Sequence, residues 1–145
     1  MIRTGGCQCG AVRFAIEGDL GTASICHCRM CQKAFGSFFG PFVTAFNERL
    51  TWTRGQPTYF QSSNLVRRGF CPACGTPLTY VVQETTTELA IGAFDDPSDI
   101  APVKQYSVHT RLPYVDDLAA LPAATLSLDP AKMVSYQHPD HDTEN

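Results

Sequence analysis

Seven cysteines in three short clusters constrain the fold of this chain more than any other feature of its sequence. They form a first pair, a middle triplet and a last pair: Cys7 and Cys9; Cys26, Cys28 and Cys31; Cys71 and Cys74. A disulfide framework would leave one of the seven sulfurs unpaired. Cysteines that only fill a core have no reason to recur at such short spacings. The clusters therefore favour metal ligation.

Coordination of zinc accounts for the spacing within each pair. Zinc takes four ligands, which commonly come as two short pairs on separate loops. Two residues between the cysteines of the last pair allow a turn that aims both sulfurs inward, and Gly75 tolerates a positive φ where that turn ends. The cysteines of the first pair share one face of an extended chain. Together the two pairs predict a closed, structural zinc site.

The middle triplet would then form a second site with an open position. Three thiolates on one short segment occupy three corners of a tetrahedron, and a free fourth corner distinguishes catalytic from structural zinc. In an alternative grouping, the last pair shares a metal with part of the triplet, and the first pair stays without a metal. Another interpretation makes one thiol of the triplet a nucleophile beside a histidine, but ligand spacing explains these sulfurs better.

Length, charge and hydropathy limit the partners that we expect. The 145 residues suit a single domain, expected over residues 1–136 and followed by a polar, flexible tail over residues 137–145. A net charge of −3, with no basic stripe beyond Arg67 and Arg68, argues against zinc knuckles that bind nucleic acid. No apolar run approaches the ~20 residues of a membrane-spanning helix, and the first residues lack the apolar segment of a signal peptide. We therefore expect a cytoplasmic protein with no nucleic-acid or membrane partner.

Short strands dominate the expected secondary structure. Val12, Phe14 and Ile16 share one face of an expected half-buried strand over residues 11–17, with Arg13 on the other face. Further short strands are expected over residues 50–54, 58–61, 65–70, 78–83, 88–94 and 105–109, and one helical turn over residues 30–35. Many short strands separated by glycine and proline favour a mainly β, sandwich-like domain.

Three segments around the cysteines resemble the glutathione-dependent formaldehyde-activating enzyme family, whose GFA domain is shared with the centromere protein V group. They are GCQCGAVRF from Gly6 to Phe14, CHCRMCQK from Cys26 to Lys33, and FCPACGTPL from Phe70 to Leu78. The matches extend over about residues 5–110. The resemblance implies a β-tent, Mss4-like fold, in which two antiparallel sheets with little helix meet around zinc. It also implies structural ligands at Cys7, Cys9, Cys71 and Cys74, and catalytic ligands at Cys26, Cys28 and Cys31.

The resemblance further implies a carbon–sulfur lyase of the S-(hydroxymethyl)glutathione synthase type. Such an enzyme uses two zinc ions per chain and condenses glutathione, or a related thiol, with formaldehyde or a similar small aldehyde. Zinc would either stabilise the thiolate or polarise the aldehyde oxygen. The alternative is a non-catalytic zinc module that binds glutathione, another small thiol or a partner. The segment 109–114 departs from the family pattern, and the oligomeric state stays open.

Charged and histidine side chains near the clusters are further candidates. Glutathione has two carboxylates, so we expect Arg29 and Lys33, which flank the middle triplet, to contact them. Other candidate cations are Arg54, Arg67 and Arg68. His27 lies between two expected ligands, so we expect it to point away from zinc and to serve structure rather than act as a general base. Three histidines are left without a firm role, the last two as a weak metal site at most: His109, His138 and His141.

Overall fold

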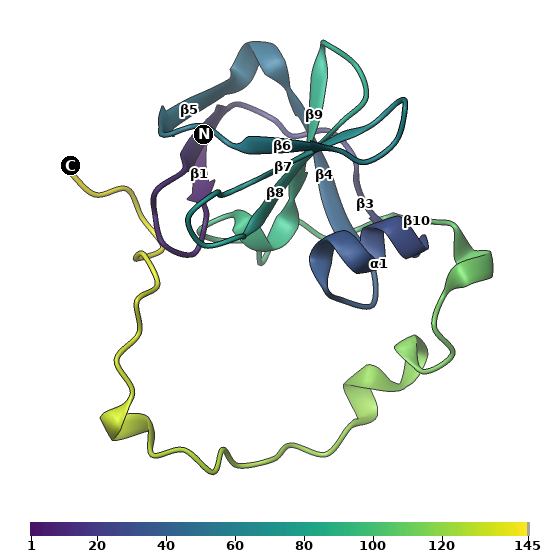
Figure 1. Cartoon of the computed structure of the whole chain (residues 1–145), viewed down its shortest axis with the longest axis vertical. Coiled ribbons are helices and arrows are strands. Elements are labelled where there is room, and N and C mark those ends of the chain that lie inside the picture. The colour runs from purple at the N-terminus through teal and green to yellow at the C-terminus, as the bar shows by residue number, and fades with distance from the viewer. Residues whose placement is uncertain (145) are drawn as a thin grey trace.

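Ten short strands form two sheets in the computed structural model of the protein, which describes residues 1–144 (Figure 1). The strands are β1 (Ile2–Gly6), β2 (Arg13–Glu17), β3 (Ala23–Cys26), β4 (Gly40–Phe46), β5 (Leu50–Arg54), β6 (Thr58–Gln61), β7 (Arg67–Phe70), β8 (Pro77–Val81), β9 (Thr86–Ala90) and β10 (Lys104–Tyr106). One sheet has the order β1-β2-β5, and the other has the order β10-β3-β4-β9-β8-β7-β6. Neighbouring strands are antiparallel except β10, which pairs with β3 in parallel. The mainly β, two-sheet fold is confirmed.

Helix is short and scarce, as expected. The α-helix α1 (Arg29–Phe35) begins where the Cys28 sulfur accepts a hydrogen bond from the backbone N–H of Cys31, and it ends at Gly36. Gly36 has a φ of 56°, a left-handed conformation in which glycine commonly terminates helices. Short 3₁₀ helices occur at Asn47–Arg49, Ile91–Ala93, Val108–Thr110, Val115–Ala120 and Pro130–Lys132. None of the helices in residues 1–144 has the length and apolar character needed to cross a bilayer.

The core lies between the two sheets and follows the alternation in β2. Phe14 and Ile16 are fully buried, each at 0% exposure, and burial of such a side chain contributes about 1.5–3 kcal/mol. The Phe14 ring meets the edges of two aromatic rings, with centroids 5.9 Å from Trp52 and 5.1 Å from Phe94. Gly5 of β1 bridges to Phe94, where a Cβ on Gly5 would collide with backbone atoms. These contacts join the small sheet to Phe94, which follows the 3₁₀ helix after β9.

Arg13 departs from the alternation that predicts it on the exposed face of its strand. Its side chain is only 4% exposed, because two carboxylates enclose the guanidinium. Asp95 accepts two hydrogen bonds of 2.7 and 2.6 Å from its Nη atoms, and Asp142 accepts one of 2.7 Å from Nη2 and one of 3.2 Å from Nε. The bidentate geometry is typical of a strong arginine–carboxylate pair. Arg13 therefore joins β2 to the turn after β9 and to the end of the chain.

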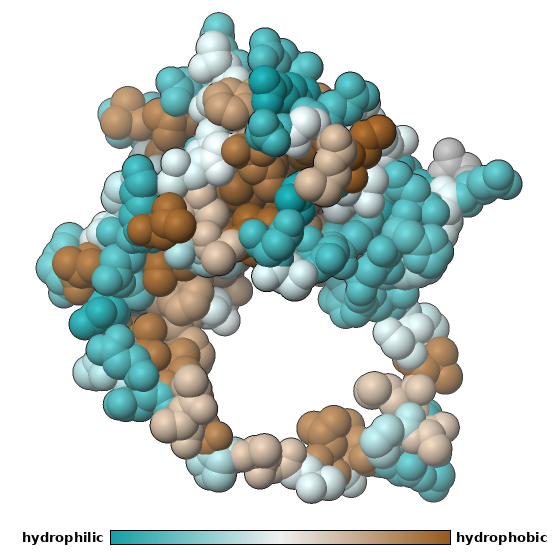
Figure 2. Space-filling model, turned by 180° about the vertical axis from the view of Figure 1, so that it is seen from behind, coloured by the Kyte–Doolittle hydropathy of each residue, from teal (hydrophilic) through white to brown (hydrophobic). Residues whose placement is uncertain are grey.

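The C-terminal segment leaves the domain after β10, follows a wide arc and returns to the loop after β1 (Figure 1). At its end, the backbone N–H of His138 donates to the Gln8 carbonyl at 2.7 Å. Apolar side chains are exposed along the arc (Figure 2): Leu121, Leu126, Leu128, Met133, Val134 and Tyr136. The flexibility expected for residues 137–145 stays a prediction, and Asn145 lies outside the described residues.

Candidate metal centres and the adjoining cavity

The first and last pairs of cysteines meet in space and form the closed cluster. The sulfurs of Cys7, Cys9, Cys71 and Cys74 lie within 4.8 Å of one another. The first pair follows β1 of the small sheet, and the last pair follows β7 of the large sheet. The cluster therefore joins the two sheets at one end. A metal held there would cross-link segments more than sixty residues apart, as a structural zinc site does.

Two loops of similar geometry present these sulfurs. In the first loop, the N–H of Cys7 donates to the Val12 carbonyl at 2.9 Å; in the second, the N–H of Cys71 donates to the Thr76 carbonyl at 3.0 Å. Each loop also contains a glycine with a φ of 80°, namely Gly10 and Gly75. A side chain at that φ is strained, so glycine suits both turns. The positive φ expected at Gly75 is confirmed.

The electrostatic environment differs among the thiols of the closed cluster. Burial raises the pKa of Cys7 to about 12. Burial also raises the pKa of Cys74, but the hydroxyl and backbone hydrogen bonds of Thr76 outweigh it and lower that pKa to about 6. Without metal, the cluster would contain buried thiols beside an easily ionised one. A divalent cation would stabilise all four as thiolates.

The middle triplet forms a separate group, the open cluster, where β3 leads into α1. The sulfurs of Cys26, Cys28 and Cys31 lie within 4.8 Å of one another, and no fourth Cys, His, Asp or Glu from residues 1–144 joins them. Cys26 ends β3, and Cys28 and Cys31 stand at the N-cap and in the first turn of α1. The seven sulfurs are thus divided as four and three. The alternative grouping, which joins the last pair to the triplet, is wrong.

His27 lies between two cysteines of the open cluster and points away from them. Its side chain is fully buried, and its Nε2 lies 3.0 Å from Gln105 Oε1 on β10. The His27 carbonyl accepts hydrogen bonds from the side chains of Gln32 and Thr110, at 2.7 and 2.9 Å. These contacts agree with the expected structural and hydrogen-bonding role, which stays a prediction. They also hold the cysteine-bearing turn against α1 and β10.

Arg68 places a buried positive charge beside the open cluster. This residue of β7 is 7% exposed, and its Nη2 donates to the Cys31 sulfur at 3.5 Å. Its Nε donates to Ser62 Oγ at 2.9 Å, and the guanidinium lies 4.9 Å from the centre of the Tyr80 ring. The remaining nitrogen, Nη1, is buried with no hydrogen-bond partner in the described part of the chain. A buried donor in this state has about 1–3 kcal/mol to gain from an acceptor.

The thiols of the open cluster respond to this charge in different degrees. Burial raises the pKa of Cys31 to about 12, although Arg68 opposes the change. Burial also raises the pKa of Cys28, but hydrogen bonds from Cys31, with help from Arg68, outweigh burial and lower it. The guanidinium therefore favours thiolates in this cluster.

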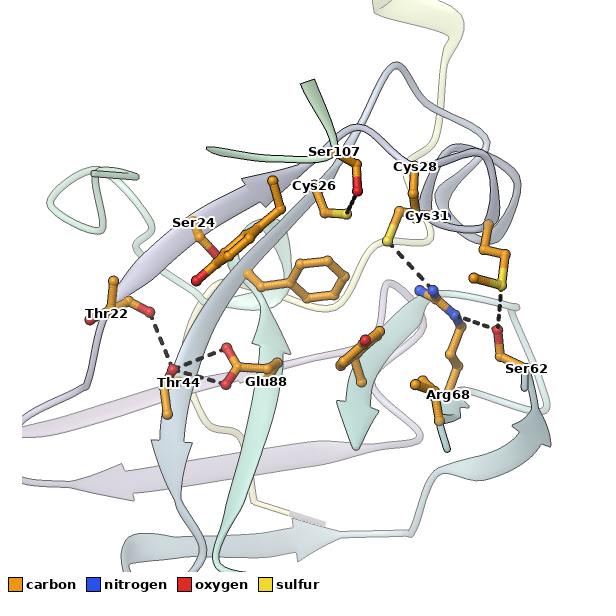
Figure 3. A pocket seen from close by; sticks show the side chains of 15 residues that line it. Thr22, Ser24, Cys26, Cys28, Cys31, Thr44, Ser62, Arg68, Glu88 and Ser107 are labelled. Atoms are coloured by element: carbon orange, nitrogen blue, oxygen red, sulfur yellow. Dashed lines mark hydrogen bonds between the residues drawn. The ribbon is translucent and has the colours of Figure 1, made fainter. Parts of the chain in front are cut away.

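A cavity of about 470 Å³ adjoins the open cluster. All three cysteines of the triplet and Arg68 line one end of it (Figure 3). The walls combine aromatic side chains with small hydroxyl groups: Phe42, Tyr80 and Tyr106; Ser24, Thr44 and Ser107. Its volume is in the range of small-molecule sites, and like them it combines a mainly apolar surface with polar groups. A ligand in this cavity would have direct access to the three sulfurs.

Glu88 lines the opposite part of the cavity, beside Thr44 (Figure 3). The Thr44 hydroxyl lies 2.9 and 3.1 Å from the two carboxylate oxygens of Glu88. Burial raises the pKa of Glu88, and the hydrogen bond from Thr44 opposes the shift only in part. The alternation in β9 gives one signal for this carboxylate, because Leu89 faces the core and Glu88 must face the other way. Nothing in the sequence shows that a cavity covers that other face.

The other expected contacts with glutathione are distributed around the molecule. Arg29 and Lys33 line a neighbouring cavity of about 420 Å³ on the α1 side, which Arg68 also borders. Arg67 stacks over Tyr59, with its guanidinium 4.3 Å from the ring centre. Arg54 donates to the carbonyl of Thr143 at 2.8 Å, near the end of the chain. Contact between Arg29 or Lys33 and a ligand carboxylate stays a prediction.

Comparisons with known proteins agree with this architecture. The solved crystal structure of a Rhodobacter sphaeroides protein is similar to this chain, with a TM-score of 0.56 and 23% sequence identity over 70% of this chain and 98% of that chain. At that identity, the similarity shows the fold alone. The sequence profile described as glutathione-dependent formaldehyde-activating enzyme matches residues 2–110, which contain both cysteine clusters and the cavity. The chain belongs to the glutathione-dependent formaldehyde-activating enzyme family.

Proposed function

We propose that this protein is a zinc-dependent carbon–sulfur lyase, located in the cytoplasm, that condenses glutathione or a related thiol with formaldehyde or a similar small aldehyde. Family membership supports the reaction class. The single observation that carries the proposal is the open cluster, three sulfurs with no fourth ligand among residues 1–144, at the wall of a cavity. An open ligand position facing a cavity is the arrangement of a catalytic zinc site.

Both clusters suit zinc. Thiolates are soft ligands that select zinc over magnesium or calcium, and four of them complete a tetrahedral structural site. We assign Cys7, Cys9, Cys71 and Cys74 to the structural ion, and Cys26, Cys28 and Cys31 to the catalytic ion. When bound in the open cluster, zinc stabilises the thiolate form of a sulfur that takes the free position.

Arg68 supplies the charge that orients the thiol in this proposal. Its buried Nη1 lacks a partner in the described chain, and its Nη2 lies 3.5 Å from the Cys31 sulfur. A carboxylate of glutathione that reaches Arg68 would satisfy this donor and form a charge-assisted hydrogen bond. The same contact would hold the thiol sulfur close to the three cysteines. Orientation of this kind lowers the entropic barrier of a bimolecular step.

The covalent step forms one carbon–sulfur bond. The thiol sulfur attacks the aldehyde carbon, the C=O π bond breaks, and the oxygen takes up the proton that the thiol has lost. The product is a hydroxymethyl thioether, and no oxidant or reductant is needed. Phe42 and Met30 form apolar parts of the cavity wall, and the Cys26 thiol donates to the Ser107 hydroxyl oxygen at 3.9 Å.

The test measures zinc content and catalysis in the same preparation. The zinc-loaded protein should hold two zinc ions per chain and interconvert formaldehyde and glutathione with their adduct faster than the spontaneous rate, followed by exchange NMR. Cys28→Ser should remove this acceleration and reduce the zinc content to one per chain. The zinc that remains identifies the closed cluster and shows that the variant is folded.

Two results would contradict the proposal. A single, tightly held zinc per chain in the unmodified protein would refute the division into two sites. Two zinc ions and tight glutathione binding, without acceleration above the spontaneous rate, would instead support a non-catalytic module that binds thiols.

A further inference from the structure

Glu88 is a half-buried carboxylate in the cavity that the proposed chemistry does not use. It lies away from the three sulfurs, on the part of the cavity floor formed by β4 and β9 (Figure 3). The neutral hydroxyl of Thr44 donates to it, and no ion pair joins it to a cation within residues 1–144. Partial burial of a carboxylate without a cationic partner costs free energy, and a ligand cation would offset that cost.

Strand register shows that Glu88 and Arg68 face the same cavity from separate strands. Thr44 of β4 pairs with Glu88 of β9, Glu88 pairs with Tyr80 of β8, and Tyr80 pairs with Arg68 of β7. Strands are about 4.8 Å apart, so the Cα atoms of Glu88 and Arg68 are separated by about 10 Å, with Tyr80 between them. The two side chains make no ion pair in the described chain. The floor therefore offers one positive and one negative group to a ligand that bears both charges.

The same register gives the length of such a ligand. Cys26 of the open cluster pairs with Gly40, whereas Glu88 pairs with Thr44, four residues further along β4. At about 3.3 Å per residue, these two positions are about 13 Å apart along the strand. β3 and β9 also lie on opposite sides of β4, and the side chains of Glu88 and of the three cysteines cover part of this span. In glutathione the γ-glutamyl arm places eight bonds between the sulfur and the ammonium nitrogen, whereas cysteine has three. A thiol with such an arm can therefore reach from the sulfurs toward Glu88, and cysteine alone is too short.

We propose that Glu88 binds the ammonium group of an elongated thiol whose sulfur lies at the open cluster and whose carboxylate contacts Arg68. The cavity would then select a zwitterionic thiol of tripeptide length over short or uncharged thiols. Thr44 positions the Glu88 carboxylate through its hydroxyl. This inference rests on the proposed function for the identity of the thiol site, and it adds the class of thiol that the site accepts.

The experiment compares two thiols that differ only in the ammonium group. Glutathione and glutaryl-cysteinyl-glycine, which has a methylene in place of the aminomethine carbon, are titrated into the zinc-loaded protein by calorimetry, without aldehyde. A charged hydrogen bond contributes about 1.5–3 kcal/mol, so glutathione should bind about 10- to 100-fold more tightly. Glu88→Gln should weaken glutathione binding by a similar factor and leave glutaryl-cysteinyl-glycine unaffected. Glu48→Gln, at an exposed carboxylate outside the cavity, is the matched control and should bind both thiols as the unmodified protein does.

The outcomes separate this inference from the proposed function. Equal affinity of the unmodified protein for the two thiols, or a preference for glutathione that survives in Glu88→Gln, would overturn the ammonium site. Failure of both thiols to bind would overturn it as well. Ammonium-dependent binding without accelerated adduct formation would support the inference and contradict only the proposed catalysis.

Discussion

Replacement of Asp95 by asparagine should destabilise the domain strongly, because it breaks a buried ion pair from one side. Asp95 accepts two hydrogen bonds from Arg13, and the two side chains are only 11% and 4% exposed. Asparagine keeps the shape of the side chain but removes its charge. The Arg13 guanidinium would then remain buried with Asp142 as its carboxylate partner, and the Asp142 side chain is 51% exposed.

The magnitude follows from the difference in exposure between the two carboxylates. Loss of one partner from a buried ion pair typically costs about 3–5 kcal/mol. Because Asp142 retains part of the interaction, we expect the lower end of that range, about 3 kcal/mol, for Asp95→Asn. Asp142→Asn removes an exposed, screened partner of the same guanidinium and should cost about 0–1 kcal/mol.

Urea unfolding of the zinc-loaded proteins, followed by circular dichroism, measures both changes. With a slope of about 1–3 kcal/mol per molar urea, the midpoint of Asp95→Asn should fall by at least about 1 M. Asp142→Asn should unfold close to the unmodified protein. A loss below 1 kcal/mol for Asp95→Asn, or an equal loss for the two variants, would refute the assignment of Asp95 as the principal partner of Arg13.

Three further predictions follow from the same geometry. Hydrogen bonds from Arg13 outweigh burial and hold the pKa of Asp95 below its ordinary value. The stability that this carboxylate contributes is therefore present above pH ~4 and is lost as the pH falls through the lower folded-state pKa. Acid unfolding of Asp95→Asn should lack this component, and an acid transition identical to that of the unmodified protein would contradict the prediction. Arg68→Gln should weaken glutathione binding by about 10-fold or more, because it removes one charge-assisted hydrogen bond. The control variant Arg67→Gln, at an exposed position, should bind glutathione normally in the same calorimetric titration. Equal effects of the two substitutions would count against the role of Arg68. A chromophoric chelator should remove zinc in two phases. The first phase empties the cavity-facing open cluster and retains the fold, and the second empties the closed cluster and unfolds the domain. A single phase with simultaneous loss of the circular dichroism signal would disagree with two distinct sites.

The sequence predicts the features that depend on local spacing. The last pair of cysteines and Gly75 define a complete turn, whose geometry is fixed within six residues. The orientation of His27 follows from its place between two cysteines that face the other way. The division of the sulfurs into four and three follows from coordination number, because zinc needs four ligands and the chain has seven cysteines.

Features that depend on distant partners could not be predicted in the same way. Arg13 stands where alternation expects an exposed residue, and its burial depends on Asp95 and Asp142, which are 82 and 129 residues away. Glu88 faces away from the core, and only the assembled sheet shows that a cavity covers that face. The parallel pairing of β10 with β3 likewise joins segments about eighty residues apart. The alternation of apolar and polar residues within one strand cannot predict contacts with such distant segments.

A crystal structure of the zinc-loaded protein with glutathione tests the central claim most directly. We predict a metal ion bound by Cys26, Cys28 and Cys31, with the glutathione sulfur as fourth ligand at about 2.3 Å and a glutathione carboxylate on Arg68. A fourth ligand from the protein itself, or glutathione bound away from the three sulfurs, would contradict it.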